Sequence, residues 1–137
     1  MSRLLLPALA FWLIAVPPAY AADEDVSVAE FLELWDGLDG PAMRQELEDT
    51  GTLDRSHYPA LVQVTDIMNA VAHTYRERIE AERAAGQVPH SCLPEGEAKL
   101  NTDDFIPHLL SYAEEERAHM SLAAAFDDHM LKAFPCH

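Results

Sequence analysis

The chain has 137 residues, of which nine are basic, 24 are acidic and two are cysteines, so its formal net charge is −15 at neutral pH. A negative charge of this size disfavours binding to nucleic acid or to anionic membrane surfaces, which are themselves negative. It favours a basic protein partner, or a solvated acidic surface that needs no partner.

Residues 1–21 have the pattern of a secretory signal peptide. Arg3 supplies a positive start, an apolar run follows, and Ala19-Tyr20-Ala21 is a small-residue cleavage pattern. The apolar run is short for a bilayer span, which favours cleavage near Ala21 over retention as a membrane anchor. We therefore expect an exported protein whose single mature domain covers residues 22–137 and has no membrane attachment after cleavage.

Helical patterns begin soon after this region. Ser27 and Glu30 have the spacing of a capping box, and residues 28–35 continue with an apolar stripe at helical spacing. A glycine-containing break follows. Pro41 suits the first turn of a short second helix, which we expect to end at Gly51.

The longest predicted helix runs from about Tyr58 to Ala85. Ser56 is its expected cap, Pro59 fits its first turn, and Gly86 follows its end. Its predicted buried stripe consists of Leu61, Val64, Met68, Val71, Ala72, Tyr75 and Ile79.

Two more helices are predicted near the C-terminus. Asn101 or Thr102 caps the first, Ser121 caps the second, and Pro135 ends the second. The charged residues 114–117 between them are expected to be exposed. The predicted buried faces are Phe105, Ile106, Leu109, Leu110 and Ala113 in the first helix, and Leu122, Ala125, Phe126, Met130, Ala133 and Phe134 in the second.

Cys92 and Cys136 are expected to form a disulfide, because an exported protein enters an oxidising compartment. Loop-entropy scaling gives such a bridge a stabilising effect of about 4 kcal/mol. A metal site is the weaker alternative, because two thiols alone do not complete a tetrahedral site. With no alternating strand pattern in the chain, the predicted fold is all-α: a small helical bundle with a C-terminal antiparallel helix pair locked by one disulfide.

The segments CLPEG at 92–96 and AFPC at 133–136, with two amphipathic helices between them, resemble the Rap/Tai family of periplasmic immunity proteins. Members of that family are small exported helical proteins that neutralise peptidoglycan amidases delivered by type VI secretion. The resemblance implies a periplasmic inhibitor whose partner is a basic amidase effector. The resemblance is also compatible with a homodimer. Many members carry further cysteines in their first helices, which this chain lacks, so its first helix is expected to be held by packing alone.

Catalytic motifs are missing from the sequence: we find no Gly-x-Ser-x-Gly elbow, phosphate-binding glycine loop or His-Glu-x-x-His motif. We therefore predict no enzyme activity, catalytic residue or cofactor. Without the resemblance, composition and spacing indicate only an exported acidic helical binding domain. The alternative function is a periplasmic chaperone or stress-related binding protein without a toxin partner.

An inhibitor needs an element that blocks a cleft, and two acidic segments are expected to project. One is the charged end of the long helix with its loop, residues 76–90, and the other is the connection at residues 114–120. Both are rich in carboxylates, which suit a positively charged enzyme surface. The residues predicted to contact a partner are Glu80, Glu82, Glu114, Glu115 and Glu116.

Metal binding is not predicted, although two short patterns resemble ligand sets. The Glu116-x-x-His119 pair is a single copy at a helix end, where an exposed charged surface is the ordinary interpretation. Residues 127–129, Asp-Asp-His, point in different directions on a helix and cannot converge on one ion. Three histidines near apolar stripes are expected to be buried or at the boundary of the core, with a pH-sensing role as the alternative: His57, His73 and His108.

Overall fold

The computed structural model describes residues 26–94 and 100–137. The predicted signal peptide, and Glu95 and Gly96 of the family-like segment, lie outside these ranges. The described α-helices are α1 (Val28–Asp36), α2 (Gly40–Thr50), α3 (Pro59–Ala84), α4 (Thr102–Leu110), α5 (Glu114–Arg117) and α6 (Leu122–Ala133). Apart from an isolated bridge between Ser27 and Ser121, these two ranges contain no β-structure, so the all-α prediction is confirmed.

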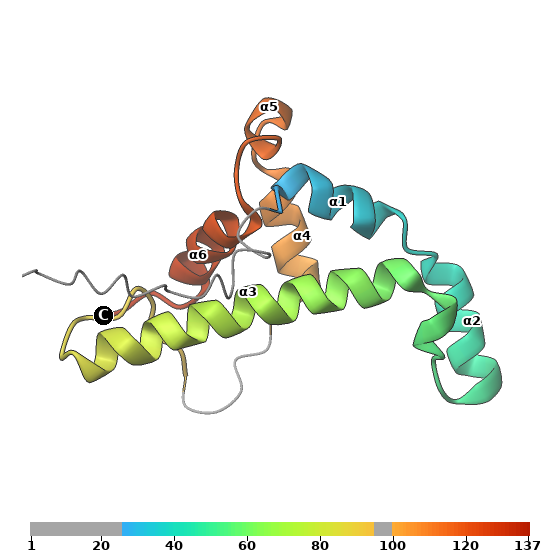
Figure 1. Ribbon diagram of the computed structural model, residues 1–137, viewed down its shortest axis with the longest axis horizontal. Coiled ribbons are helices and arrows are strands. Elements are labelled where there is room, and N and C mark those ends of the chain that lie inside the picture. The colour runs from blue at the N-terminus through green and yellow to red at the C-terminus, as the bar shows by residue number, and fades with distance from the viewer. Residues whose placement is uncertain (1–25, 95–99) are drawn as a thin grey trace, which may run out of the picture.

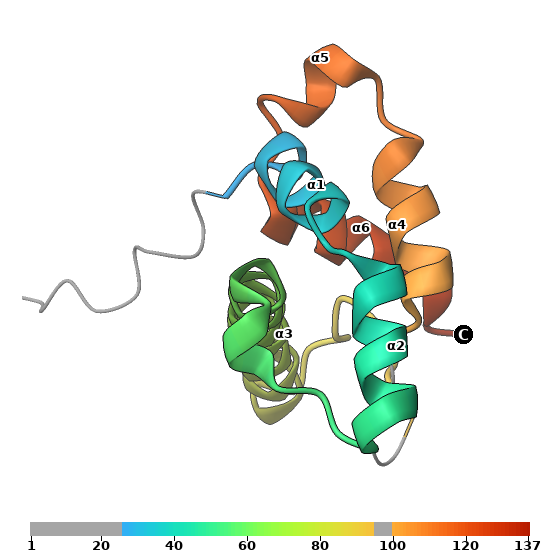
Figure 2. The same cartoon turned by 90° about the vertical axis from the view of Figure 1, so that its right-hand side faces the viewer.

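The long helix α3 forms the base of the molecule, and α1, α4 and α6 lie along one side of it (Figure 1). The short helix α2 lies beyond one end of this layer, and α5 projects from the opposite side to α3 (Figure 2). None of the helices in the described ranges has the length and apolar character needed to cross a membrane.

The predicted caps of α1, α4 and α6 are confirmed. The Ser27 Oγ accepts a hydrogen bond from Glu30 N (3.2 Å), and the Glu30 carboxylate accepts one from Ser27 N (2.8 Å). Asn101 Oδ1 accepts from the backbone at the start of α4, and Ser121 Oγ does the same for α6. These contacts satisfy backbone N–H groups that have no partner within the helix.

The predicted cap of the long helix is wrong. Ser56 lies inside a short 3₁₀ turn, Arg55–His57, which is capped by Asp54. The helix α3 starts at Pro59 without a side-chain cap. Proline lacks the N–H that a cap would otherwise satisfy, so its position at the first turn reduces the need for one.

The core is formed by α1, α3, α4 and α6. All of its buried apolar residues belong to the stripes predicted from periodicity: Val28, Phe31, Leu32, Val64, Val71, Tyr75, Ile79, Phe105, Leu109, Leu122, Ala125, Phe126 and Met130. Three predicted members are exposed instead, since they are the last residues of α4 and α6 or, in one case, lie beyond the end of α4. These are Leu110, whose surface is 50% exposed, Ala113 and Ala133.

The predicted disulfide is confirmed. Cys92 and Cys136 are bonded, with their Cα atoms 4.9 Å apart and a separation of 44 positions in the sequence. Next to the bridge, Cys92 N donates a hydrogen bond to Phe134 O (2.8 Å). A chain terminus normally frays, so the two contacts together explain how the end of α6 stays attached to the loop after α3.

The helix α2 contributes no buried residue. Its end is fixed locally, because Glu46 Oε1 accepts a hydrogen bond from Asp54 N (3.0 Å). Gly51 follows the helix with φ of 71°, a left-handed conformation that favours glycine. The position of α2 therefore depends on its connections more than on the core.

Candidate interaction surface

The base of α5 is fixed to the body of the protein by backbone hydrogen bonds. Val28 N donates to Met120 O (2.9 Å), and Leu122 N donates to Val26 O (2.8 Å). These bonds join the segment just before α1 to the segment just before α6. The α5 connection therefore projects from an anchored base, beyond α1 and α4 (Figure 1).

The three carboxylates of α5 are all exposed, as predicted, but they differ in their contacts. Glu116 Oε2 accepts a hydrogen bond from the backbone at the start of the helix (3.2 Å). Arg117 turns back toward the body, where its Nε donates to Tyr112 O (2.9 Å). No ion pair or side-chain hydrogen bond within residues 26–94 and 100–137 involves Glu114 or Glu115, so these two charges face solvent.

A shallow hollow lies at the foot of α5, between this helix and α6. Met120 and Ala124 contribute its apolar part, and Glu115, Glu116 and His119 its polar part. An apolar floor beside carboxylates suits a lysine or arginine, whose side chain has an apolar stem and a charged head.

The two predicted contact residues of α3 lie in different environments. Glu80 is exposed. Glu82 accepts hydrogen bonds from Arg78 Nε (2.9 Å) at one oxygen and from His90 N (2.6 Å) at the other. These two donors hold the pKa of Glu82 below its usual value. The Glu82 carboxylate therefore stabilises the loop after α3, and Glu80 remains the more accessible of the two.

The charged end of α3 is largely solvated, as predicted, since residues 80, 81 and 83–88 are exposed, but its beginning is attached to the core. Ile79 in this segment is only 1% exposed and belongs to the core. Arg78 Nη1 donates to Asp127 Oδ2 on α6 (2.7 Å), and His90 Nε2 lies 3.1 Å from Asp127 O. Burial raises the pKa of Asp127, although Arg78 acts in the opposite direction. The start of this charged segment and His90 after it therefore contact α6, while the residues between them are mostly exposed.

Replacing Arg78 tests this packing. We expect Arg78→Ala to lower the free energy of unfolding by about 1 kcal/mol, because Glu82 and Asp127 both lose a charged donor. The loss stays modest because the ion pairs are partly exposed and screened by solvent. Urea denaturation would measure it, with the exposed Arg76→Ala as control, expected within about 0.5 kcal/mol of wild type. Equal losses for the two variants would contradict a stabilising role of the Arg78 contacts.

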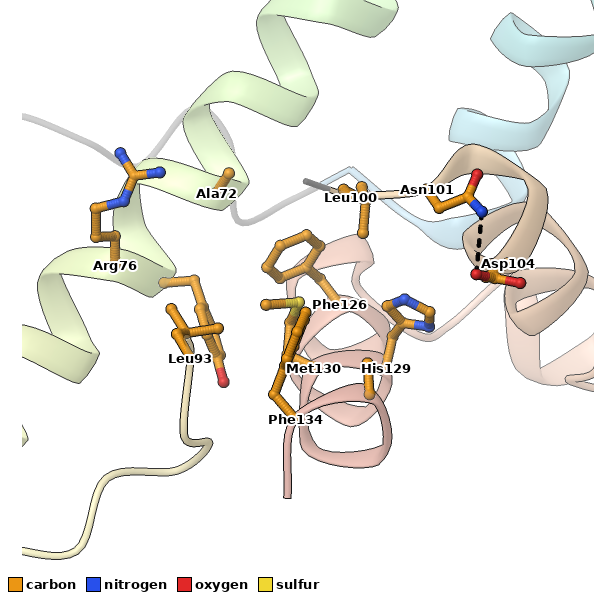
Figure 3. A pocket seen from close by; sticks show the side chains of 12 residues that line it. Ala72, Arg76, Leu93, Leu100, Asn101, Asp104, Phe126, His129, Met130 and Phe134 are labelled. Atoms are coloured by element: carbon orange, nitrogen blue, oxygen red, sulfur yellow. Dashed lines mark hydrogen bonds between the residues drawn. The ribbon is translucent and has the colours of Figure 1, made fainter. Parts of the chain in front are cut away.

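A cavity of about 350 Å³ opens between α3, α4 and α6 (Figure 3). At one side of it, Asn101 Nδ2 donates to Asp104 Oδ2 (3.1 Å), and His129 lies nearby on α6. The cavity has the size of a small-molecule site, and its surface is mostly apolar. Its apolar residues are Ala72, Leu93, Leu100, Phe126, Met130 and Phe134, together with Ala133.

The histidines divide into two groups. His57 and His73, expected near the core, are instead surface residues whose side chains are 62% and 63% exposed and pair with neighbouring carboxylates. His108 lies at the α4–α6 boundary, as expected, with a side chain that is 10% exposed. Its Nε2 lies 3.2 Å from Ala125 O.

The Asp-Asp-His segment of α6 does not converge on one point. Asp127 faces α3, Asp128 Oδ2 accepts a hydrogen bond from Tyr112 OH (2.6 Å), and the His129 ring packs edge-on against Phe105 (centroids 5.2 Å apart). The described part of the chain contains no group of three or more His, Cys, Asp or Glu side chains placed to hold a metal ion.

Polar contacts of Asp128 and Ser91 were also not predicted from the sequence. Asp128 accepts from both Tyr112 and Lys132, whose Nζ lies 2.8 Å from Oδ2. The spacing of four between Asp128 and Lys132 on one helix could have indicated the second contact. The fully buried Ser91 forms a hydrogen bond with Tyr75 OH, and no local pattern predicts this pairing of a loop with α3.

The fold and surface define a disulfide-linked, all-α protein with a projecting acidic helix. No protein-family model, curated protein or solved structure matches the chain. The functional argument therefore depends on the residues and their geometry, together with the motif resemblance.

Proposed function

We propose that the protein is an exported, periplasmic immunity-type protein that binds and inhibits a basic peptidoglycan amidase. The resemblance to the Rap/Tai family supplies the class of partner. The structural observation that carries the proposal is the anchored projection of α5, with Glu114 and Glu115 directed to solvent. The disulfide is compatible with an oxidising compartment.

An inhibitor of this kind acts by occupying the entrance of the enzyme's cleft. An element whose base is already fixed loses little conformational entropy on binding, which favours affinity. The carboxylates of α5 attract a positive surface and orient the encounter. The hollow beside Glu115 and Met120 accommodates a lysine or arginine from the rim of that cleft.

Partner capture tests the proposal. The mature chain, with its disulfide intact, is immobilised and exposed to lysate and secreted material of the source cells, and bound proteins are identified by mass spectrometry. Stoichiometric recovery of one basic peptidoglycan hydrolase, whose activity the protein inhibits, would support the proposal. Recovery of many unrelated proteins, with no hydrolase inhibited, would contradict it.

Charge reversal then tests the placement of the binding surface. We expect the double variant Glu114→Lys/Glu115→Lys to weaken hydrolase binding by at least about tenfold, because two attractive charges become repulsive. The matched control is Glu48→Lys/Asp49→Lys, which makes the same charge change on the exposed face of α2. Equal affinities for the two variants in a titration assay would contradict a role for α5.

A different feature of the structure supports the alternative function, a periplasmic chaperone. An apolar groove of about 390 Å³ lies between α1, α2, α3 and α4, and its surface includes Trp35, Leu38, Met43, Met68 and Ile106. Such a groove suits exposed apolar segments of unfolded proteins. The chaperone function requires that the mature protein suppress aggregation of several unrelated unfolded substrates, which an inhibitor specific for one enzyme would not do.

A further inference from the structure

Two histidine rings meet where α4 packs against α6. The centroids of His108 and His129 lie 5.1 Å apart, and His129 also packs against Phe105. A short distance between two partly buried imidazoles is compatible with neutral rings, whereas two positive charges there would repel each other. We propose that His108 and His129 form an acid-sensitive latch, which holds α4 against α6 at neutral pH and releases this contact in acid.

His129 is poorly placed to carry a charge. No side-chain hydrogen bond within the described ranges involves its ring. Burial, followed by the effect of His108, lowers the pKa of His129, and the carboxylates of Asp104 and Asp128 only partly oppose this. The titratable and charged groups around it are Asp104 and His108 from α4, Asp128 and Lys132 from α6, and Tyr75 and Arg76 from α3 across the cavity.

Three oxygen atoms surround one ring nitrogen of His108. Its Nε2 lies 3.2 Å from Ala125 O, 3.0 Å from Tyr112 OH and 3.5 Å from Asp128 Oδ2. Because Tyr112 OH donates its own proton to Asp128, these three oxygens are all available as acceptors. The Nε2 of His108 therefore carries a proton and donates to Ala125 O of α6, so the charge on which the latch depends is the one taken up by His129.

The direction of the pH effect follows from proton linkage. The ring of His129 takes up a proton more readily in an opened form, where it is solvated, than in the closed form. The closed form is therefore fully favoured above the ordinary imidazole pKa of about 6.5 and loses stability as the pH falls below it. Proton uptake in acid thus shifts the equilibrium toward separation of α4 from α6.

Opening of the latch would affect α5, because of its position in the chain. Since α5 lies between α4 and α6 along the chain, separation of these helices removes the fixed spacing of its two ends. The disulfide keeps the end of α6 attached to the loop after α3, which confines the opening to the side of α4. The latch would thus regulate the element assigned to partner binding. This consequence rests on the proposed function, but the latch itself can be tested without a partner.

The first measurement is a titration of the histidine Cε1–H resonances in the mature protein by NMR. We expect the midpoint of His129 to lie below the ordinary imidazole pKa of about 6.5. Amide hydrogen exchange, corrected for intrinsic rates, is then compared at about pH 7.5 and about pH 5. Protection in α4 and α5 should fall at least about tenfold more than protection in the middle of α3. A His129 midpoint at or above about 6.5 would overturn the proposal.

Variants assign the effect to this pair. His129→Phe keeps an aromatic ring beside Phe105 and removes the charge, so we expect it to retain α4 protection at about pH 5. His73→Gln removes an exposed histidine and should behave like wild type. If His129→Phe lost protection in acid as the wild type does, the latch would be excluded. Failure of partner capture would leave this result unaffected, so the two proposals can fail separately.

Discussion

Replacing either Cys92 or Cys136 by serine is expected to lower the free energy of unfolding by about 4 kcal/mol, a large share of the stability of a small domain. The bridge spans 44 positions and restricts the unfolded chain strongly, because it closes a long loop. The bridge also keeps the C-terminal residues attached to the loop after α3, next to the hydrogen bond from Cys92 N to Phe134 O. Thermal or urea denaturation of each variant would measure the loss.

The double variant distinguishes a disulfide from two independent buried thiols. Both single substitutions remove the same bond, so Cys92→Ser/Cys136→Ser should be no less stable than either single variant. Reduction of the wild-type protein with a thiol reagent should produce a similar loss. Additive losses in the double variant would mean that each cysteine stabilises the protein separately.

Helical periodicity predicted the core well, for a physical reason. A helix that packs on one side must repeat its apolar residues every three or four positions, and the stripe is visible wherever the other faces are polar. Phe31 on α1, Val71 on α3, Phe105 on α4 and Phe126 on α6 were all recognised in this way. The stripe does not reveal where the neighbouring helix ends, so Leu110 was wrongly predicted to be buried in the core.

The contacts of the charged end of α3 could not be predicted from the sequence. Arg78 and Glu82 are four positions apart on one helix, a spacing typical of a local ion pair, and the structure contains this pair. The second partner of Arg78 is Asp127, which lies 49 positions further along the chain. No local pattern connects residues so far apart, so the contact of Arg78 with α6 could not be predicted for a segment that is otherwise mostly exposed.

The candidate interaction surface was predicted only in part. The acidic run at residues 114–117 indicated exposure, and the exposure is confirmed. The sequence did not indicate a helix at this position or the anchoring of its base. That anchoring depends on the backbone of Val26 and Val28 meeting Met120 and Leu122, and backbone pairing between distant segments leaves no side-chain signature.

The other large effect is expected at Phe105, the residue that joins α4 to the rest of the core. Its ring is 1% exposed and makes edge-on contacts with Phe31 (6.5 Å between centroids), Phe126 (5.8 Å) and His129 (5.2 Å). Phe105→Ala should lower the free energy of unfolding by about 3–5 kcal/mol, since it removes buried apolar surface and leaves a cavity. Urea denaturation followed by circular dichroism would measure this.

Leu110→Ala on the same helix provides the matched control, because this side chain is half exposed and its loss should stay below about 1 kcal/mol. Phe105→Leu keeps most of the apolar volume and should fall between the two, which covers the case in which Phe105→Ala does not fold. All three substitutions are made in α4. The expected order of the three losses therefore reflects how much buried apolar volume each one removes. A Leu110→Ala loss as large as that of Phe105→Ala would mean that α4 packs through its other face. The contact between His108 and His129 would then lie outside the core, and the basis for the acid-sensitive latch would fail with it.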